Sequence, residues 1–222
     1  MAKILSMSVV SKMLVCRLSG TLGDKVYYSR DGVNYVRKRT VHIHQPNSPA
    51  QLVQRARFNT ILRFLKPLAV FLRVGFQSQS AKMSPFNAAM SCNLNSAIAG
   101  TYPEFRIDYA KAMVSRGNLP GALNPIVKFT KKSELEFTWA NNSMDDYAMA
   151  DDKVMLVVYN LEKQQAVTIE NGNMRIIGSQ SITLPSSFAG DEVQCYIAFK
   201  DYWQKKVSDS QFVGGIVVEV RR

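Results

Sequence analysis

Seven short β-prone runs crowd residues 121–222 of this chain, and no other feature constrains its fold as strongly. They are ELEFTWAN, KVMLVVYN, AVTIENG, MRIIGSQ, SITLP, EVQCYIAFKDYW and GGIVVEV. Turn-forming clusters such as NNSMDD and ENGN separate them, which is typical of an antiparallel β-sandwich. In the first run, alternation places Leu135, Phe137 and Trp139 on one face. We therefore predict a half-buried strand there, with Trp139 as a core anchor.

The segment SRGNLPGALNP, residues 115–125, holds two glycines and two prolines. Glycine and proline at this density end helices and form turns. The sequence therefore predicts a domain boundary here, between a basic hairpin and helical region at 1–120 and a β-sandwich domain at 121–222. The fold class expected for the whole chain is α+β.

Local signals upstream of this boundary predict a hairpin and helices. Asp31-Gly32 lies between two β-prone runs, and a tight hairpin turn needs the positive φ that glycine adopts readily. Ser48 and Ser84 each precede a proline and an apolar pattern, so each is expected to cap a helix N-terminus. Pro67 falls inside the first helical pattern and predicts a kink or a break.

Charge is distributed unevenly along the chain, whose formal net charge is +11. Residues 1–120 hold 17 Lys and Arg against 4 Asp and Glu, whereas residues 121–222 hold 11 against 13. Such asymmetry indicates an anionic partner for the first half: nucleic acid, a membrane surface or an acidic protein face. A basic but merely solvated face is the alternative.

The basic half supplies the candidate contacts for an anionic partner or a protein interface. These are Arg30, Tyr35, Arg37, Lys38, Arg39, Arg55, Arg57, Lys66 and Arg73. In an extended strand Tyr35, Arg37 and Arg39 share one face. On a helix, Arg55, Lys66 and Arg73 are close to whole turns apart and predict one basic stripe. Arg57 would point to the opposite side, where it would need a buried carboxylate or a partner subunit.

No constellation for catalysis, cofactor binding or metal binding emerges from the sequence. His42 and His44 lack neighbouring cysteines, and the cluster MDDYAMADD lacks the spacing of an EF-hand, so we expect a solvated loop there. Neither a phosphate-binding loop nor a nucleophile elbow is present. No apolar run reaches membrane-spanning length, and the N-terminus lacks a secretory pattern, so a cytoplasmic, non-enzymatic protein is expected.

Several stretches together resemble an uncharacterised bacterial family of about this length. They are GTLGDKVYYSRDGVNYVRKR, PNSPAQLVQRARF, FLKPL, SPFNAAMSCNL, SRGNLPGA and ADDKVMLVVYN. The resemblance implies no activity and no catalytic residue. A looser similarity links the chain to phage and prophage proteins, some of which carry fibronectin-type-III-like modules. It implies an immunoglobulin- or fibronectin-III-like C-terminal sandwich and a virion-associated role.

Two functions remain open at this point. The first is a structural or interaction protein that acts by assembly, through self-association or with other structural proteins, because the N-terminal module has strand edges and little to close a core. The alternative is a sequence-independent nucleic-acid-binding protein that uses the basic N-terminal half.

Overall fold

Residues 8–9, 19–30, 32–40, 48–79, 83–131, 133–143, 147–203 and 206–219 are described by the computed structural model of the chain. The chain divides into two compact units, Met1–Asn47 (unit 1) and Ser48–Arg222 (unit 2). This division does not coincide with the boundary near residue 120 that the sequence predicted, because the helices after residue 48 share a core with later strands.

Unit 1 contains the predicted hairpin. Strands β3 (Lys25–Arg30) and β4 (Val33–Lys38) pair antiparallel, and Gly32 in the turn has φ of +78°. The hairpin and its positive-φ glycine are thus confirmed. Two short strands, β1 (Ser8–Val9) and β2 (Gly20–Leu22), flank it, giving the order β1-β4-β3-β2.

Unit 2 begins with helices whose starts follow the predicted capping chemistry. The Ser48 side chain accepts a hydrogen bond from the Gln51 N–H, and α1 starts at Pro49. The helices are α1 (Pro49–Leu65), α2 (Ala69–Gly75) and α3 (Pro85–Ser96). A 3₁₀ turn, η1 (Lys66–Leu68), separates α1 from α2 and holds Pro67, as the break predicted there requires. Within the described ranges, no helix is long and apolar enough to cross a membrane.

Antiparallel strands form the rest of unit 2. The larger sheet has the order β10-β9-β12-β13 and the smaller the order β11-β8-β7, while β5 and β6 form a short ribbon. The strands are β5 (Ile98–Ala99), β6 (Arg106–Ile107), β7 (Leu123–Lys131), β8 (Glu134–Ala140), β9 (Lys153–Asn160), β10 (Gln165–Ile169), β11 (Ser179–Thr183), β12 (Glu192–Lys200) and β13 (Gln211–Val217). Further 3₁₀ turns are η2 (Gln77–Gln79), η3 (Arg175–Ile177) and η4 (Ser186–Phe188).

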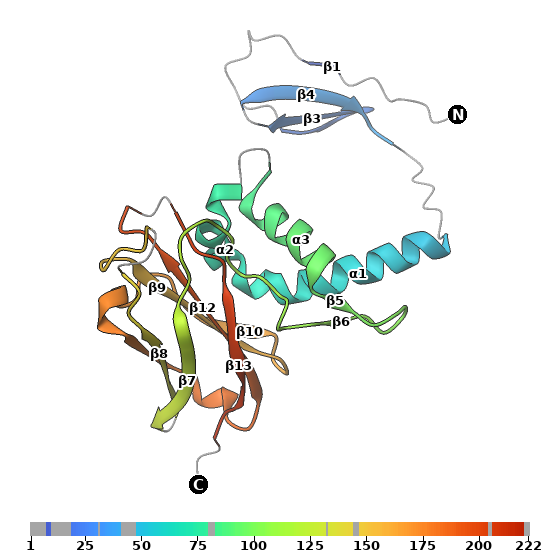
Figure 1. Ribbon diagram of the computed structural model, residues 1–222. Helices are drawn as coiled ribbons and strands as arrows, with labels where there is room; N and C mark the ends of the chain where they lie inside the picture. Colours follow the sequence, from blue (N-terminus) through green and yellow to red (C-terminus); the bar gives the residue numbers. More distant parts are fainter. Residues whose placement is uncertain are drawn as a thin grey trace. The chain divides into compact units, whose positions relative to one another are not determined.

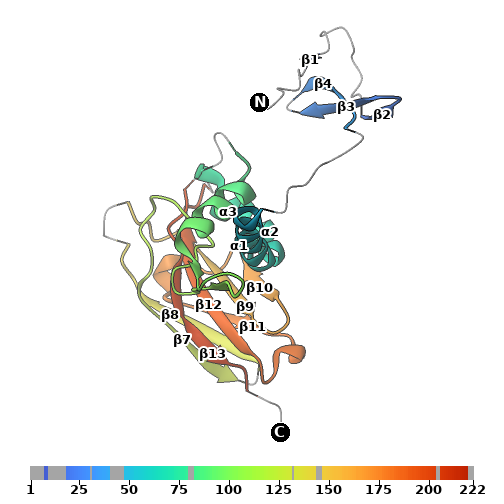
Figure 2. The same cartoon turned by 90° about the vertical axis from the view of Figure 1, so that its right-hand side faces the viewer.

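The larger sheet is buried on both faces. Along β9, Val154, Leu156 and Val158 pack toward the smaller sheet, while Met155 and Val157 pack toward the helices. Figure 1 shows α1, α2 and α3 on one side of β9, β10 and β12, and Figure 2 views α1 nearly end-on above the strands. Unit 2 therefore has three layers, helices on a sheet on a second sheet, with one core on each side of β9 and β12.

The fold class is confirmed as a mixed α/β chain with antiparallel sheets and an N-terminal hairpin. Two details differ from the predicted runs. MRIIGSQ forms η3 before β11 begins, and β7 went unpredicted because Pro125 marked its start as a turn. Proline is tolerated at this position because β7 is the edge strand of its sheet and its register shifts between Leu123 and Ile126.

Candidate functional site

Tyr28, Tyr35 and Arg37 of the hairpin lie on one face of unit 1, whereas Tyr27, which pairs with Val36, lies on the other. Tyr28 and Tyr35 are cross-strand partners whose rings stack with centroids 5.3 Å apart and an interplanar angle of 18°. Arg37 pairs with Val26, two positions further along each strand, so it lies on the tyrosine face. Arg37 is exposed. This face joins an aromatic stack to a solvent-exposed cation.

The opposite face of the hairpin carries a second pair of cations. Lys38 lies directly across from Lys25, and both are exposed. Like charges directly opposite each other destabilise a sheet. A bound anion would remove this repulsion.

The other two hairpin candidates lie at the ends of the strands. Arg30 is the last residue of β3 and pairs with Val33 across the turn. Arg39 follows β4, is exposed, and its backbone N–H donates to the Asp24 carbonyl. The cations of unit 1 are thus distributed along the whole length of the hairpin.

Unit 1 shows no buried residue among positions 19–29 and 32–40. Leu22 is 74% exposed and Val33 is 38% exposed. A packed face is what normally makes a small sheet stable in water. Its described residues thus form a sheet without a core of their own.

The helical candidates separate into two groups. Arg55, Lys66 and Arg73 are exposed on α1, η1 and α2. Arg57 instead donates from Nη2 to the Leu94 carbonyl at 3.1 Å. The prediction that Arg57 needs a carboxylate or a partner subunit is therefore wrong.

The reason lies at the end of α3. A carbonyl in the last turn of a helix has no intrahelical donor, and this end carries the negative pole of the helix dipole. Arg57 satisfies both needs in α3, which contains Leu94 in its last turn. Its role is to join α1 to α3.

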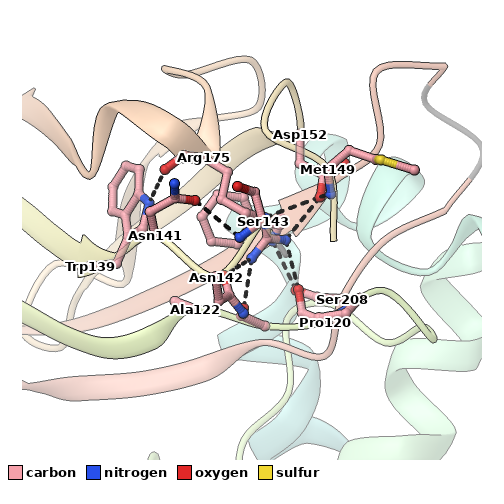
Figure 3. Close-up of polar contacts among 12 residues, drawn as sticks. Pro120, Ala122, Trp139, Asn141, Asn142, Ser143, Met149, Asp152, Arg175 and Ser208 are labelled. Atoms are coloured by element: carbon pink, nitrogen blue, oxygen red, sulfur yellow. Dashed lines mark hydrogen bonds and ion pairs between the residues drawn. The ribbon is translucent and has the colours of Figure 1, made fainter. Parts of the chain in front are cut away.

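The most connected polar group of unit 2 is Arg175, which the sequence analysis did not single out (Figure 3). It is fully buried and its Nε and Nη2 atoms each lie 3.1 Å from Oδ2 of Asp152. Its Nη1 donates to the Gly121 carbonyl at 2.8 Å and to Asn142 Oδ1 at 2.7 Å. Its Nη2 also donates to the Pro120 carbonyl at 2.8 Å. All five guanidinium N–H groups thus have acceptors.

The surroundings of Arg175 add further contacts, but Asp152 Oδ1 is buried without a hydrogen-bond partner among the described residues. Its guanidinium lies 3.8 Å from the ring centre of Phe199, and its carbonyl accepts a hydrogen bond from Trp139 Nε1 at 2.8 Å. The Met149 N–H donates to Asp152 Oδ2 at 2.9 Å. Burial raises the pKa of the Asp152 carboxyl and lowers that of Arg175, while the contact between the two groups opposes both changes.

This network joins separate segments and has no open face for a substrate. Asp152 belongs to the cluster predicted to be a solvated loop, and that expectation is wrong for Asp152, which is 0% exposed because it neutralises Arg175. No spacing in the sequence links residues 152 and 175, so no local signal could have paired them. We infer that the network of Arg175 and Asp152 has a structural role.

The segment 115–122, predicted as a boundary, is held firmly within unit 2. The Ser115 hydroxyl is fully buried and donates to the Ser208 carbonyl at 2.7 Å. Gly117 packs so closely that an added Cβ would lie 2.1 Å from the Val207 carbonyl oxygen. A glycine is required here for close backbone approach, and the segment behaves as part of the core.

The residue types that bind metals do not cluster in the described parts of the chain. No three His, Cys, Asp or Glu side chains there are grouped so that they could hold a metal ion. His42, His44, Asp145 and Asp146 lie outside the described residues. Two surfaces remain as candidate functional sites. They are the tyrosine and arginine face of unit 1 and the exposed cations of α1–α2.

Two comparisons with known proteins bear on the chain. A family model described as "Family of unknown function (DUF6266)" matches residues 17–214. The match covers the hairpin and nearly all of unit 2. A search of curated proteins finds no match.

Proposed function

The chain belongs to this family of unknown function, whose description assigns no activity, and we propose from its geometry that it is a non-enzymatic protein that acts by assembly. In this proposal unit 1 is a docking arm. Its hairpin face binds a second copy of the chain or another structural protein.

One observation carries the proposal: residues 19–29 and 32–40 are well paired in a sheet, yet none of them is buried. Folding must offset about 1–2 kcal/mol of backbone entropy for each ordered residue, and burial of apolar surface is the main favourable term. A second surface that covers Tyr28 and Tyr35 would supply that burial.

Symmetric self-association would provide the surface that covers Tyr28 and Tyr35. A homo-oligomer presents the same arm on every copy, and an arm that docks on a different patch of its neighbour makes rings or open lattices. A phage- or prophage-derived virion component needs to form such rings or lattices. The interpretation of the two stacked sheets of unit 2 as a fibronectin-III-like sandwich belongs to the same hypothesis.

Light scattering across protein concentration tests the proposal. We expect a defined oligomer in moderate salt for the natural chain, and a shift to monomer when Tyr28 and Tyr35 are both changed to Ala. Tyr102→Ala is the matched control, since Tyr102 is 48% exposed in unit 2. A chain that stays monomeric at every concentration would exclude self-association through the arm.

A further inference from the structure

Four exposed cations lie along α1, η1 and α2. The inward side of these elements is buried, through Ile61, Phe64, Leu65, Leu68, Phe71 and Leu72. The exposed cations lie among and beside these positions in the sequence. They are Arg55, Arg63, Lys66 and Arg73, here called the helical stripe.

Three of these cations fit one line along the helices. Arg55, Lys66 and Arg73 are 11 and 7 residues apart, close to whole turns of about 3.6 residues. Arg63 lies about 60–80° to one side of that line. With a rise of about 1.5 Å per residue the stripe extends over about 27 Å. Arg63 joins the three cations that the sequence had selected, and Arg57 is excluded because it is held by α3.

The stripe lies in a part of the sequence that contains no acid. No Asp or Glu occurs between Asp31 and Glu104. Arg63 and Lys66 are three residues apart and both exposed, and like charges at this spacing repel each other. The helix dipole accounts for one cation at each helix end, such as Arg63 and Arg73, but not for four on one side.

We infer that the helical stripe is a binding site for the phosphate backbone of nucleic acid. A linear polyanion complements a linear row of cations, and phosphate contacts of this kind bind without reading sequence. A membrane surface fits less well, because an interfacial helix inserts its apolar face into the bilayer, whereas α1 and α2 bury that face against the sheet. This activity goes beyond assembly and does not depend on it.

Fluorescence anisotropy with the full-length chain tests the inference. The probes are fluorescein-labelled 20-nucleotide oligothymidylate and a 20-base-pair duplex, each titrated at 50 and 200 mM salt. The test variant carries Arg63→Gln, Lys66→Gln and Arg73→Gln. The control carries Arg106→Gln, Lys111→Gln and Lys128→Gln, which remove the same charge from exposed positions outside the stripe.

The natural chain should lose about 100-fold or more in duplex affinity between the two salt levels if four phosphates are contacted. In the stripe variant the log–log salt slope on duplex should fall by about 0.9 per lost cation, and the control variant should keep the natural slope. Equal slopes for both variants would overturn the inference, as would a natural chain that binds neither probe at 50 mM salt.

Two further measurements separate this inference from its competitors. Binding to phosphatidylserine vesicles with no binding to either oligonucleotide would assign the stripe to membranes and overturn the inference. Light scattering on the same variants should show the natural oligomer, because the stripe is not the docking arm. A stripe variant that loses both its oligomer and its affinity would identify the stripe as a protein interface and likewise overturn it.

Discussion

The sheet of unit 1 and the larger sheet of unit 2 both have regular antiparallel pairing but differ in what covers them. Along β9, seven of the eight residues are buried, and its two faces belong to two different cores. Along β4 none is buried. Regular strand pairing therefore does not by itself make a core, because hydrogen bonds between strands replace those with water and contribute modestly in net terms. In our proposal the uncovered sheet is the surface that binds a partner.

Unit 1 and unit 2 should differ most in their resistance to proteolysis. Trypsin should cut first after Lys38 or Arg39, which are exposed in unit 1, and leave segment 115–122 intact. Opening that segment requires breaking the core of unit 2, whereas a coreless sheet opens at little cost. Mass spectrometry of the early fragments gives the order of cleavage. Early cleavage at Arg116, which is exposed, would show that the segment opens independently and restore the boundary predicted from sequence.

Within unit 2, Trp139→Ala should reduce the free energy of unfolding by roughly 3–5 kcal/mol. Trp139 is 5% exposed, packs edge-on against Phe199 and donates to the Arg175 carbonyl. The substitution leaves a cavity and removes the donor of a buried hydrogen bond. Urea denaturation followed by circular dichroism measures the loss. Trp203→Ala, at a position 76% exposed, is the control and should change stability by less than about 0.5 kcal/mol.

Arg175→Met should cost a comparable amount, about 3–5 kcal/mol, because it leaves the Asp152 carboxylate buried without its counterion. Arg175→Lys should not restore stability, since an ammonium cannot reach the four acceptor atoms that the planar guanidinium contacts. The same denaturation experiment applies, with the exposed Arg116→Met as control. If Arg175→Met unfolds at the natural urea midpoint, the network does not hold the segment in place.

Local chemistry explains which features the sequence predicted correctly. Ser48, Ser84 and Gly32 depend on neighbours within a few residues, so their roles follow from spacing alone. Asp152 and Arg175 pair across 23 residues, and nothing local distinguishes them from other charged residues. The sequence did indicate the core that β9 shares with the helices. VMLVVY is apolar without alternation, and an unbroken apolar run indicates a strand covered on both faces.

The candidate surfaces show the same difference between features that depend on nearby residues and contacts that depend on distant ones. Tyr35 and Arg37 share a face because side chains alternate along any strand, so the sequence alone predicts this placement. The role of Arg57 was missed because its acceptor, the Leu94 carbonyl, comes from another helix. Exposure of the helical stripe, by contrast, followed from helical periodicity, and only Arg63 was overlooked.

The smallest expected effect concerns Gly32 and tests whether the two units are energetically separate. Gly32→Ala should destabilise the hairpin by on the order of 1 kcal/mol, because Ala resists the positive φ of this turn. An added Cβ would meet no atom within 4 Å, so the backbone penalty acts alone. Amide hydrogen exchange should therefore accelerate in β3 and β4 roughly fivefold, as 1 kcal/mol implies, while protection in β9 and β12 stays unchanged. Loss of protection in β9 as well would mean that the hairpin supports the core of unit 2, and the contrast between a covered and an uncovered sheet would then fail.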